Sequence, residues 1–189
     1  MKKFELTSEF ITNIFGTKLF RIKALIEFGN VKAGELGGFV EKEENLSQDG
    51  NAWVYDSACV YGNACVCGDA CVCDNARVYG NAWVYGNARV HDSARVYGDA
   101  CVCGDACVCG DACVYGDAGY ATVHGFGSEY RTTTFFKTKA GDIGVKCGCF
   151  YGNLSEFRKK VVETHGETKK AKEYLMLADL MEFRFSDNS

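Results

Sequence analysis

The chain has 189 residues, 12 cysteines, no proline and a formal net charge of −4 at pH 7. Its length accommodates a repeat with small caps, and no apolar run approaches the roughly 20 residues that cross a membrane. Met1, Lys2 and Lys3 lead into mixed sequence rather than into a secretory signal peptide. We therefore expect a cytoplasmic protein with free thiols and no membrane contact. The acidic charge also argues against direct nucleic-acid binding.

Residues 1–45 are expected to form an N-terminal β-rich cap. Short apolar stretches alternate there with Gly-containing turns, which is typical of strands. A solenoid requires such caps because its end coils would otherwise expose the core.

Eleven hexads follow in unbroken register from Ala52 to Asp117. Each reads Ala, a variable residue, Val, then Tyr, Cys or His, and ends in a pair such as Gly-Asn or Gly-Asp. Alternate residues of a strand share a face, so Ala and Val should point inward and the second and fourth positions outward. Gly, Asn and Asp tolerate the tight backbone of corners. Val40 and Leu46 continue the spacing upstream, so we place the repeat at residues 46–118 with a first rung near Val40.

This pattern resembles the left-handed β-helix of hexapeptide-repeat proteins. The resemblance implies a triangular coil of three hexads, hence an 18-residue turn, with coils stacked about 4.8 Å apart. The predicted fold is therefore mainly β: a left-handed parallel β-helix of roughly four coils, with an N-terminal β cap and a small C-terminal α+β domain.

The 18-residue turn places outward residues in columns. Stacked aromatic rings beside guanidinium groups suit a protein hot spot or a bound nucleotide, although a ladder that only stabilises the coil would look the same. The predicted binding residues are Tyr61, Arg77, Tyr79, Arg95, Tyr97, Tyr115, Arg89 and His91. Apolar rows on the other faces indicate an oligomer or partner face made of Trp53, Tyr55, Trp83 and Tyr85.

Metal binding within one subunit is not predicted, although the coils contain several C-x-C pairs. The pairs that share a face, such as Cys71/Cys73 and Cys107/Cys109, are 36 residues apart. Two coils span about 9.6 Å, and zinc ligands lie about 2.0–2.3 Å from one ion. A metal held between subunits stays open, and no cofactor is predicted.

Residues 119–189 are expected to form the α+β domain. Strands are predicted at 132–138 and 143–150, a helix from Asn153 or Ser155 to Gly166, and a second helix over 168–180. Residues 181–185, MEFRF, are expected to form a final strand.

The order of GELGGFVEKEENLS, NAxVYGNA hexads and a CGCFYGNLSEF…THG segment is similar to a family of small proteins from bacteriophage and prophage genomes. The similarity covers nearly the whole chain. It implies a phage-encoded protein in a bacterial host cytoplasm, and it brings no catalytic residue with it.

We therefore predict a non-catalytic binding protein, a homo-oligomer (dimer or trimer), that binds a host protein or complex and inhibits an anti-phage defence system in an anti-CRISPR-like manner. One alternative is sequestration of a signalling nucleotide between subunits. The other is a hexapeptide-repeat acyltransferase, for which His91 in the coils and His124 beyond them are the candidate bases. Against an enzyme, no second acid or base is predicted beside His91, and no inserted loop shapes a pocket.

Overall fold

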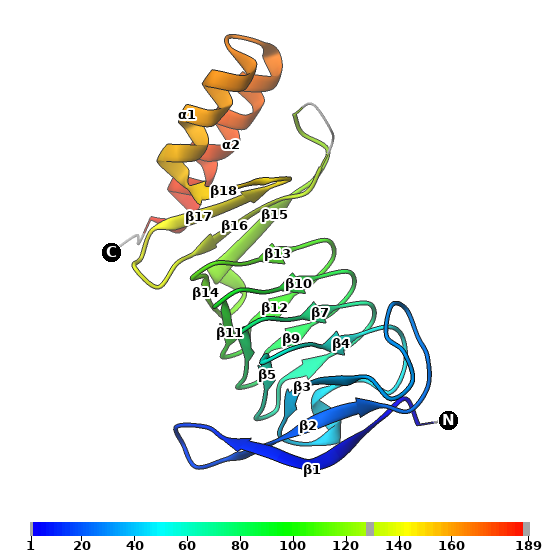
Figure 1. Ribbon diagram of the computed structural model, residues 1–189. Helices are drawn as coiled ribbons and strands as arrows, with labels where there is room; N and C mark the ends of the chain where they lie inside the picture. Colours follow the sequence, from blue (N-terminus) through cyan, green and yellow to red (C-terminus); the bar gives the residue numbers. More distant parts are fainter. Residues whose placement is uncertain (1, 128–130, 187–189) are drawn as a thin grey trace.

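The computed structural model describes residues 2–127 and 131–186, and Figure 1 shows a stack of coils between a hairpin and a small sheet with two helices. Each hexad contributes one short strand. The strands are β4 (Trp53–Val54), β5 (Cys59–Val60), β6 (Cys65–Val66), β7 (Cys71–Val72), β8 (Arg77–Val78), β9 (Trp83–Val84), β10 (Arg89–Val90), β11 (Arg95–Tyr97), β12 (Cys101–Val102), β13 (Cys107–Val108) and β14 (Cys113–Tyr115).

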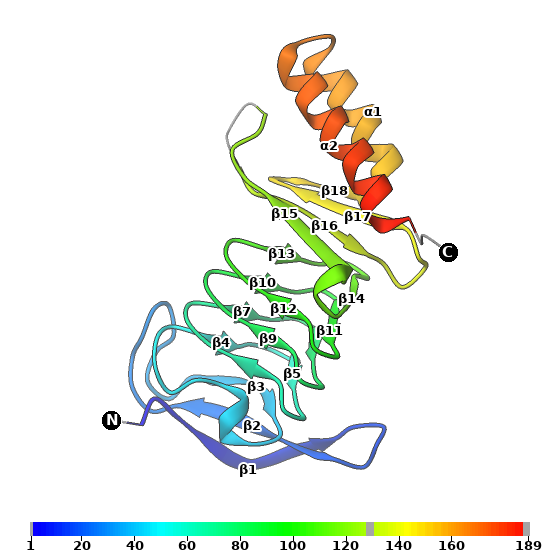
Figure 2. The same ribbon diagram turned by 180° about the vertical axis from the view of Figure 1, so that it is seen from behind.

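The coils stack in parallel with an offset of 18 residues. Cys59 pairs with Arg77, and Arg77 pairs with Arg95, in the same parallel register. The strands of one face form the sheet β13-β10-β7-β4, and those of a second face form β12-β9-β6 (Figures 1 and 2). These pairings confirm the predicted parallel β-helix of about four turns.

The N-terminal strands extend the third face of the β-helix. β1 (Phe4–Thr12) and β2 (Lys18–Ala24) form an antiparallel hairpin, and β3 (Leu36–Val40) pairs with β2 on one side and with β5 on the other. The short helix η1 (Glu43–Asn45) then leads into the coils. One seven-stranded sheet, β1-β2-β3-β5-β8-β11-β14, therefore runs from the hairpin to the last coil.

The core of the β-helix consists of the Ala and Val of every hexad, all 0–1% exposed. Trp53 also belongs to this core, because its ring packs edge-on against Phe4 at 6.2 Å and Phe28 at 5.3 Å. The prediction that Trp53 lies on an outward partner face is therefore wrong: the N-terminal cap covers that end of the column.

The C-terminal residues form a four-stranded antiparallel sheet and two helices. These elements are η2 (Asp117–Gly119), β15 (Tyr120–Val123), β16 (Thr133–Lys137), β17 (Ile143–Cys147), β18 (Phe150–Asn153), α1 (Leu154–His165) and α2 (Lys169–Phe185). Asn153 caps α1 by accepting a hydrogen bond from the Glu156 N–H, and the helix ends at Gly166, as expected.

Two predictions for this region are wrong. Residues 181–185 do not form a strand, because Met181 and Phe185 continue the buried stripe of α2 at helical spacing. The single strand predicted over 143–150 is two strands, because Gly148 turns the chain with φ 57° between β17 and β18.

The C-terminal sheet closes the upper end of the β-helix. Phe136 joins the buried cluster of the coils, and Thr138 forms a β-bridge with Ala112. The Lys139 N–H donates to the Asp111 carbonyl across the same junction. No helix among the described residues is long and apolar enough to cross a membrane.

Candidate functional site

The first candidate site is an aromatic ladder on the seven-stranded sheet. Tyr61 and Tyr79 stack at 5.0 Å with their planes 2° apart, and Tyr79 stacks on Tyr97 at 5.1 Å. Tyr115 continues the column at 5.1 Å but is tilted by 47°. The repeat explains this arrangement, because parallel strands in register bring identical side chains into van der Waals contact.

Two arginines stand beside the ladder. Arg77 is exposed and Arg95 is half-buried, and within residues 2–127 and 131–186 neither has a carboxylate within salt-bridge distance. Burial raises the pKa of Tyr61 and of Tyr79, while the nearby guanidinium groups oppose that rise. We call the set Tyr61, Arg77, Tyr79, Arg95, Tyr97 and Tyr115 the tyrosine face. It presents a rigid aromatic surface with unpaired positive charge on a protein that is acidic overall.

The tip of the β1–β2 hairpin extends the tyrosine face. Ile11 and Ile14 line a cavity of about 140 Å³ together with Tyr61 and Arg77. Ile14 is 85% exposed and Phe15 is 74% exposed. The sequence analysis missed this extension, although a pair of large apolar residues directly before the turn glycine is a signal for it.

The other predicted residues are spread over two further faces. Arg89 lies in β10 and His91 directly after it, on the face formed by the sheet β13-β10-β7-β4. Tyr55 is half-buried and comes directly after β4, at the other end of that sheet from β13. Trp83, 53% exposed, and Tyr85 belong to the sheet β12-β9-β6. The structure therefore does not gather all the predicted binding residues into one site.

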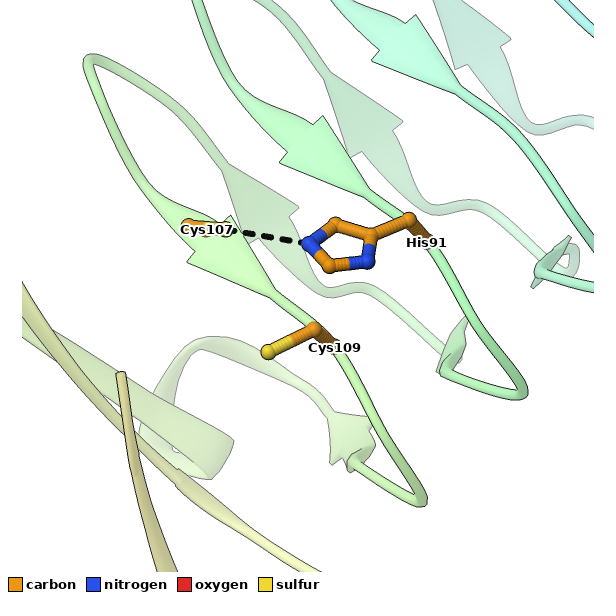
Figure 3. Close-up of side chains that lie close together, drawn as sticks. All are labelled: His91, Cys107 and Cys109. Atoms are coloured by element: carbon orange, nitrogen blue, oxygen red, sulfur yellow. Dashed lines mark hydrogen bonds between the residues drawn. The ribbon is translucent and has the colours of Figure 1, made fainter. Parts of the chain in front are cut away.

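The second candidate site surrounds His91 (Figure 3). The imidazole Nε2 lies 3.3 Å from the Cys107 Sγ, on the next coil, and Cys109 follows directly after the strand β13 of that coil. The other ring nitrogen, Nδ1, lies 3.1 Å from an Asp92 carboxylate oxygen. The expectation that no acid or base stands beside His91 is therefore wrong.

The electrostatics of this cluster favour a thiolate. A hydrogen bond from Cys109, together with His91 and the Lys146 ammonium of β17, lowers the pKa of the Cys107 thiol to about 5. The hydrogen bond with Cys107, together with burial, raises the pKa of Cys109. The hydrogen bond with Cys107 also raises the pKa of His91. A low-pKa, half-buried thiol beside an imidazole is the arrangement that makes cysteine a nucleophile or a metal ligand.

Comparison with known proteins supports the repeat. Residues 70–86 and 76–98 match the family described as YdcK beta solenoid repeat. The chain is also 40% identical over 63 residues to a protein named "Uncharacterized acetyltransferase YdcK" from Escherichia coli (strain K12). That similarity covers 30% of this chain and 19% of the relative's length.

Proposed function

We propose that this chain is a non-catalytic binding protein whose tyrosine face and hairpin tip dock onto an acidic, partly apolar surface of a partner protein. The observation that carries this proposal is the stacked tyrosine ladder beside Arg77 and Arg95, which have no acidic partner among the described residues. Tyrosine and arginine are enriched in the few residues that supply most of the binding energy of protein interfaces.

The rigidity of the face also favours binding. Tyr79 and Tyr97 are each held between two ladder rings, so little of their side-chain entropy remains to be lost when a partner docks. The exposed Ile14 and Phe15 add apolar surface next to the charged columns. The apolar rings with the positive charges of Arg77 and Arg95 beside them match a partner surface that is apolar and carries negative charge next to its apolar part.

The resemblance to phage proteins directs the proposal to a bacterial target. We assign the partner to the proteins of an anti-phage defence system, met in the host cytoplasm. The free chain is proposed to be a dimer or trimer, because Trp83 and Tyr85 leave apolar area exposed on the sheet β12-β9-β6.

The test is a double charge reversal, Arg77→Glu with Arg95→Glu. Both changes lie on the surface and should leave the melting temperature nearly unchanged. Partner capture from bacterial lysate, followed by biolayer interferometry on the captured protein, should show at least about tenfold weaker binding. Arg89→Glu is the control, because Arg89 is exposed, like Arg77, but lies on a different face. Equal binding by the double variant, or an equal loss in the control, refutes the tyrosine face as the site.

A second candidate function is acyl transfer. The observations that favour it are the contacts of His91 with Asp92 and Cys107, and the name of the partly similar E. coli protein. Asp92 would hold the imidazole in one tautomer while Nε2 accepts the proton of an attacking group. This function requires acetyl-coenzyme A binding and product formation that His91→Ala abolishes, whereas the binding function predicts neither.

A further inference from the structure

We propose that His91, Cys107 and Cys109 form a zinc site between the two uppermost rungs of the sheet β13-β10-β7-β4. The three donor atoms all lie within 4.8 Å of one another, and His91 Nε2 lies 3.3 Å from Cys107 Sγ. Figure 3 shows the imidazole reaching from its own coil toward the next coil, which carries both cysteines.

These separations fit one tetrahedral ion. Zinc binds imidazole nitrogen at about 2.0–2.1 Å and thiolate sulfur at about 2.3 Å, so its donors lie about 3.4–3.8 Å apart. Small rotations of the three side chains bring the donors to these separations without moving the strands. The donor atoms of this site are closer together than C-x-C pairs that lie two coils apart, because they come from adjacent coils.

The surroundings of the imidazole favour metal binding. Nδ1 faces the Asp92 carboxylate at 3.1 Å, and that carboxylate accepts a hydrogen bond from the Gly110 N–H at 2.8 Å. Asp92 thus holds a proton on Nδ1, so Nε2, which faces Cys107, is the nitrogen that binds the metal once its own proton has left. A carboxylate behind the histidine is the usual outer support of a zinc ligand.

Charge and access are also suitable. Zinc binding displaces the thiol protons of Cys107 and Cys109, and the two resulting thiolates balance the charge of one zinc ion. Cys109 is buried, whereas Cys107 and His91 are half-buried, so an ion can enter from solvent. Three protein ligands leave the fourth position of the ion for water or a small ligand.

Cys71 and Cys73 provide an internal comparison. They lie on the coil at the other side of His91 and have the same C-x-C spacing. The Cys73 thiol donates to the Asp74 carboxylate instead, and these two sulfurs are not part of the cluster of donors around Nε2. Substituting this pair therefore controls for the general effect of losing two thiols.

The experiment uses the full chain, reduced and stripped of metal with a chelator. Zinc is titrated in competition with a chromophoric chelator, and cobalt serves as a spectroscopic probe of thiolate ligation. The wild-type chain should bind one ion tightly, with the charge-transfer and visible bands of tetrahedral thiolate-bound cobalt. Cys107→Ser with Cys109→Ser should abolish that site, Cys71→Ser with Cys73→Ser should retain it, and Asp92→Asn should bind zinc about 10–100-fold more weakly.

Several results would overturn the proposal. They are the absence of tight zinc binding by the wild-type chain, a cobalt spectrum without thiolate bands, or an equal loss of zinc affinity in the Cys107/Cys109 and Cys71/Cys73 double variants. Circular dichroism of the metal-free variants shows whether they fold, and His91→Asn is the second test if a cysteine variant does not. The outcome is independent of the tyrosine face, which lies on another sheet.

Discussion

A glycine-to-alanine pair tests the stacking of the coils directly. Gly80 and Gly104 both occupy corner positions, with φ of +75° and +64°. A Cβ at Gly80 would meet the Gly98 backbone nitrogen at 2.9 Å and its carbonyl oxygen at 3.2 Å, whereas a Cβ at Gly104 would meet nothing within 4 Å.

The two substitutions share one cost and differ in another. Each places a Cβ in the left-handed region, which costs about 1–2 kcal/mol, and each gains about 0.4–1 kcal/mol from a stiffer unfolded chain. Gly80→Ala adds an overpacking cost of about 1–3 kcal/mol, because the contacted atoms are backbone and cannot move aside. The difference between the variants therefore isolates the contact between coils, and Gly80→Ala should be the less stable by about 1–3 kcal/mol.

Urea unfolding followed by circular dichroism measures this difference, provided that both variants unfold with the same denaturant dependence. Equal destabilisation of the two variants would refute the reasoning, since it would mean that Gly80 and Gly98 do not lie one above the other. A milder effect at Gly80 than at Gly104 would refute it more strongly.

Three further predictions concern the cap and the helices. Trp53→Ala should cost about 3–5 kcal/mol because the ring is fully buried, and Trp83→Ala should cost less than about 1 kcal/mol; melting temperatures compare them. Burial lowers the pKa of Lys3 from 10.5 to about 8, so between these values the unfolded chain holds more protons and the Lys3 contribution to stability rises with pH. Lys3→Met should remove that rise, measured as the difference in urea midpoint between wild type and variant across this window. The Nη2 of the half-buried Arg158 lies 2.7 Å from the exposed carboxylates of both Asp179 and Glu182, so Arg158→Ala should lower the free energy of unfolding by at most about 1 kcal/mol in the same assay.

The repeat made most of the fold predictable. Because one hexad defines the inward and outward positions of all the others, the buried Ala and Val, the 18-residue register and the tyrosine ladder all followed from residue spacing alone. Outside the repeat no such constraint applies. The end of α2 resembles a strand in sequence because MEFRF is rich in aromatic residues, whereas the i, i+4 pair Met181 and Phe185 lies on the buried face of the helix.

The candidate sites were harder to predict for a geometric reason. The 18-residue turn predicts straight columns, but the side chain at the fourth position of a hexad contacts the side chain at the second position of a hexad in the next coil. His91 contacts Cys107, Tyr97 contacts Cys113 and Tyr85 contacts Cys101, each 16 residues later. The burial of Trp53 depends on Phe4 and Phe28, which are distant in sequence, so no local pattern could reveal it.

Because the offset between coils is constant, the number of hexads sets both the distance and the relative orientation of the two ends of the β-helix. Each coil is hydrogen-bonded to its neighbours through the same offset, as where the Asn63 amide donates to Asn81 and the Asn81 amide donates to the Asp99 carboxylate. Adding three hexads would move the hairpin and the helices about 4.8 Å further apart and leave their relative orientation unchanged. Adding a single hexad would instead turn the C-terminal sheet and its helices onto the next face. Variants of this chain that differ by whole coils would keep their two ends facing the same way, at a reach set by the number of coils.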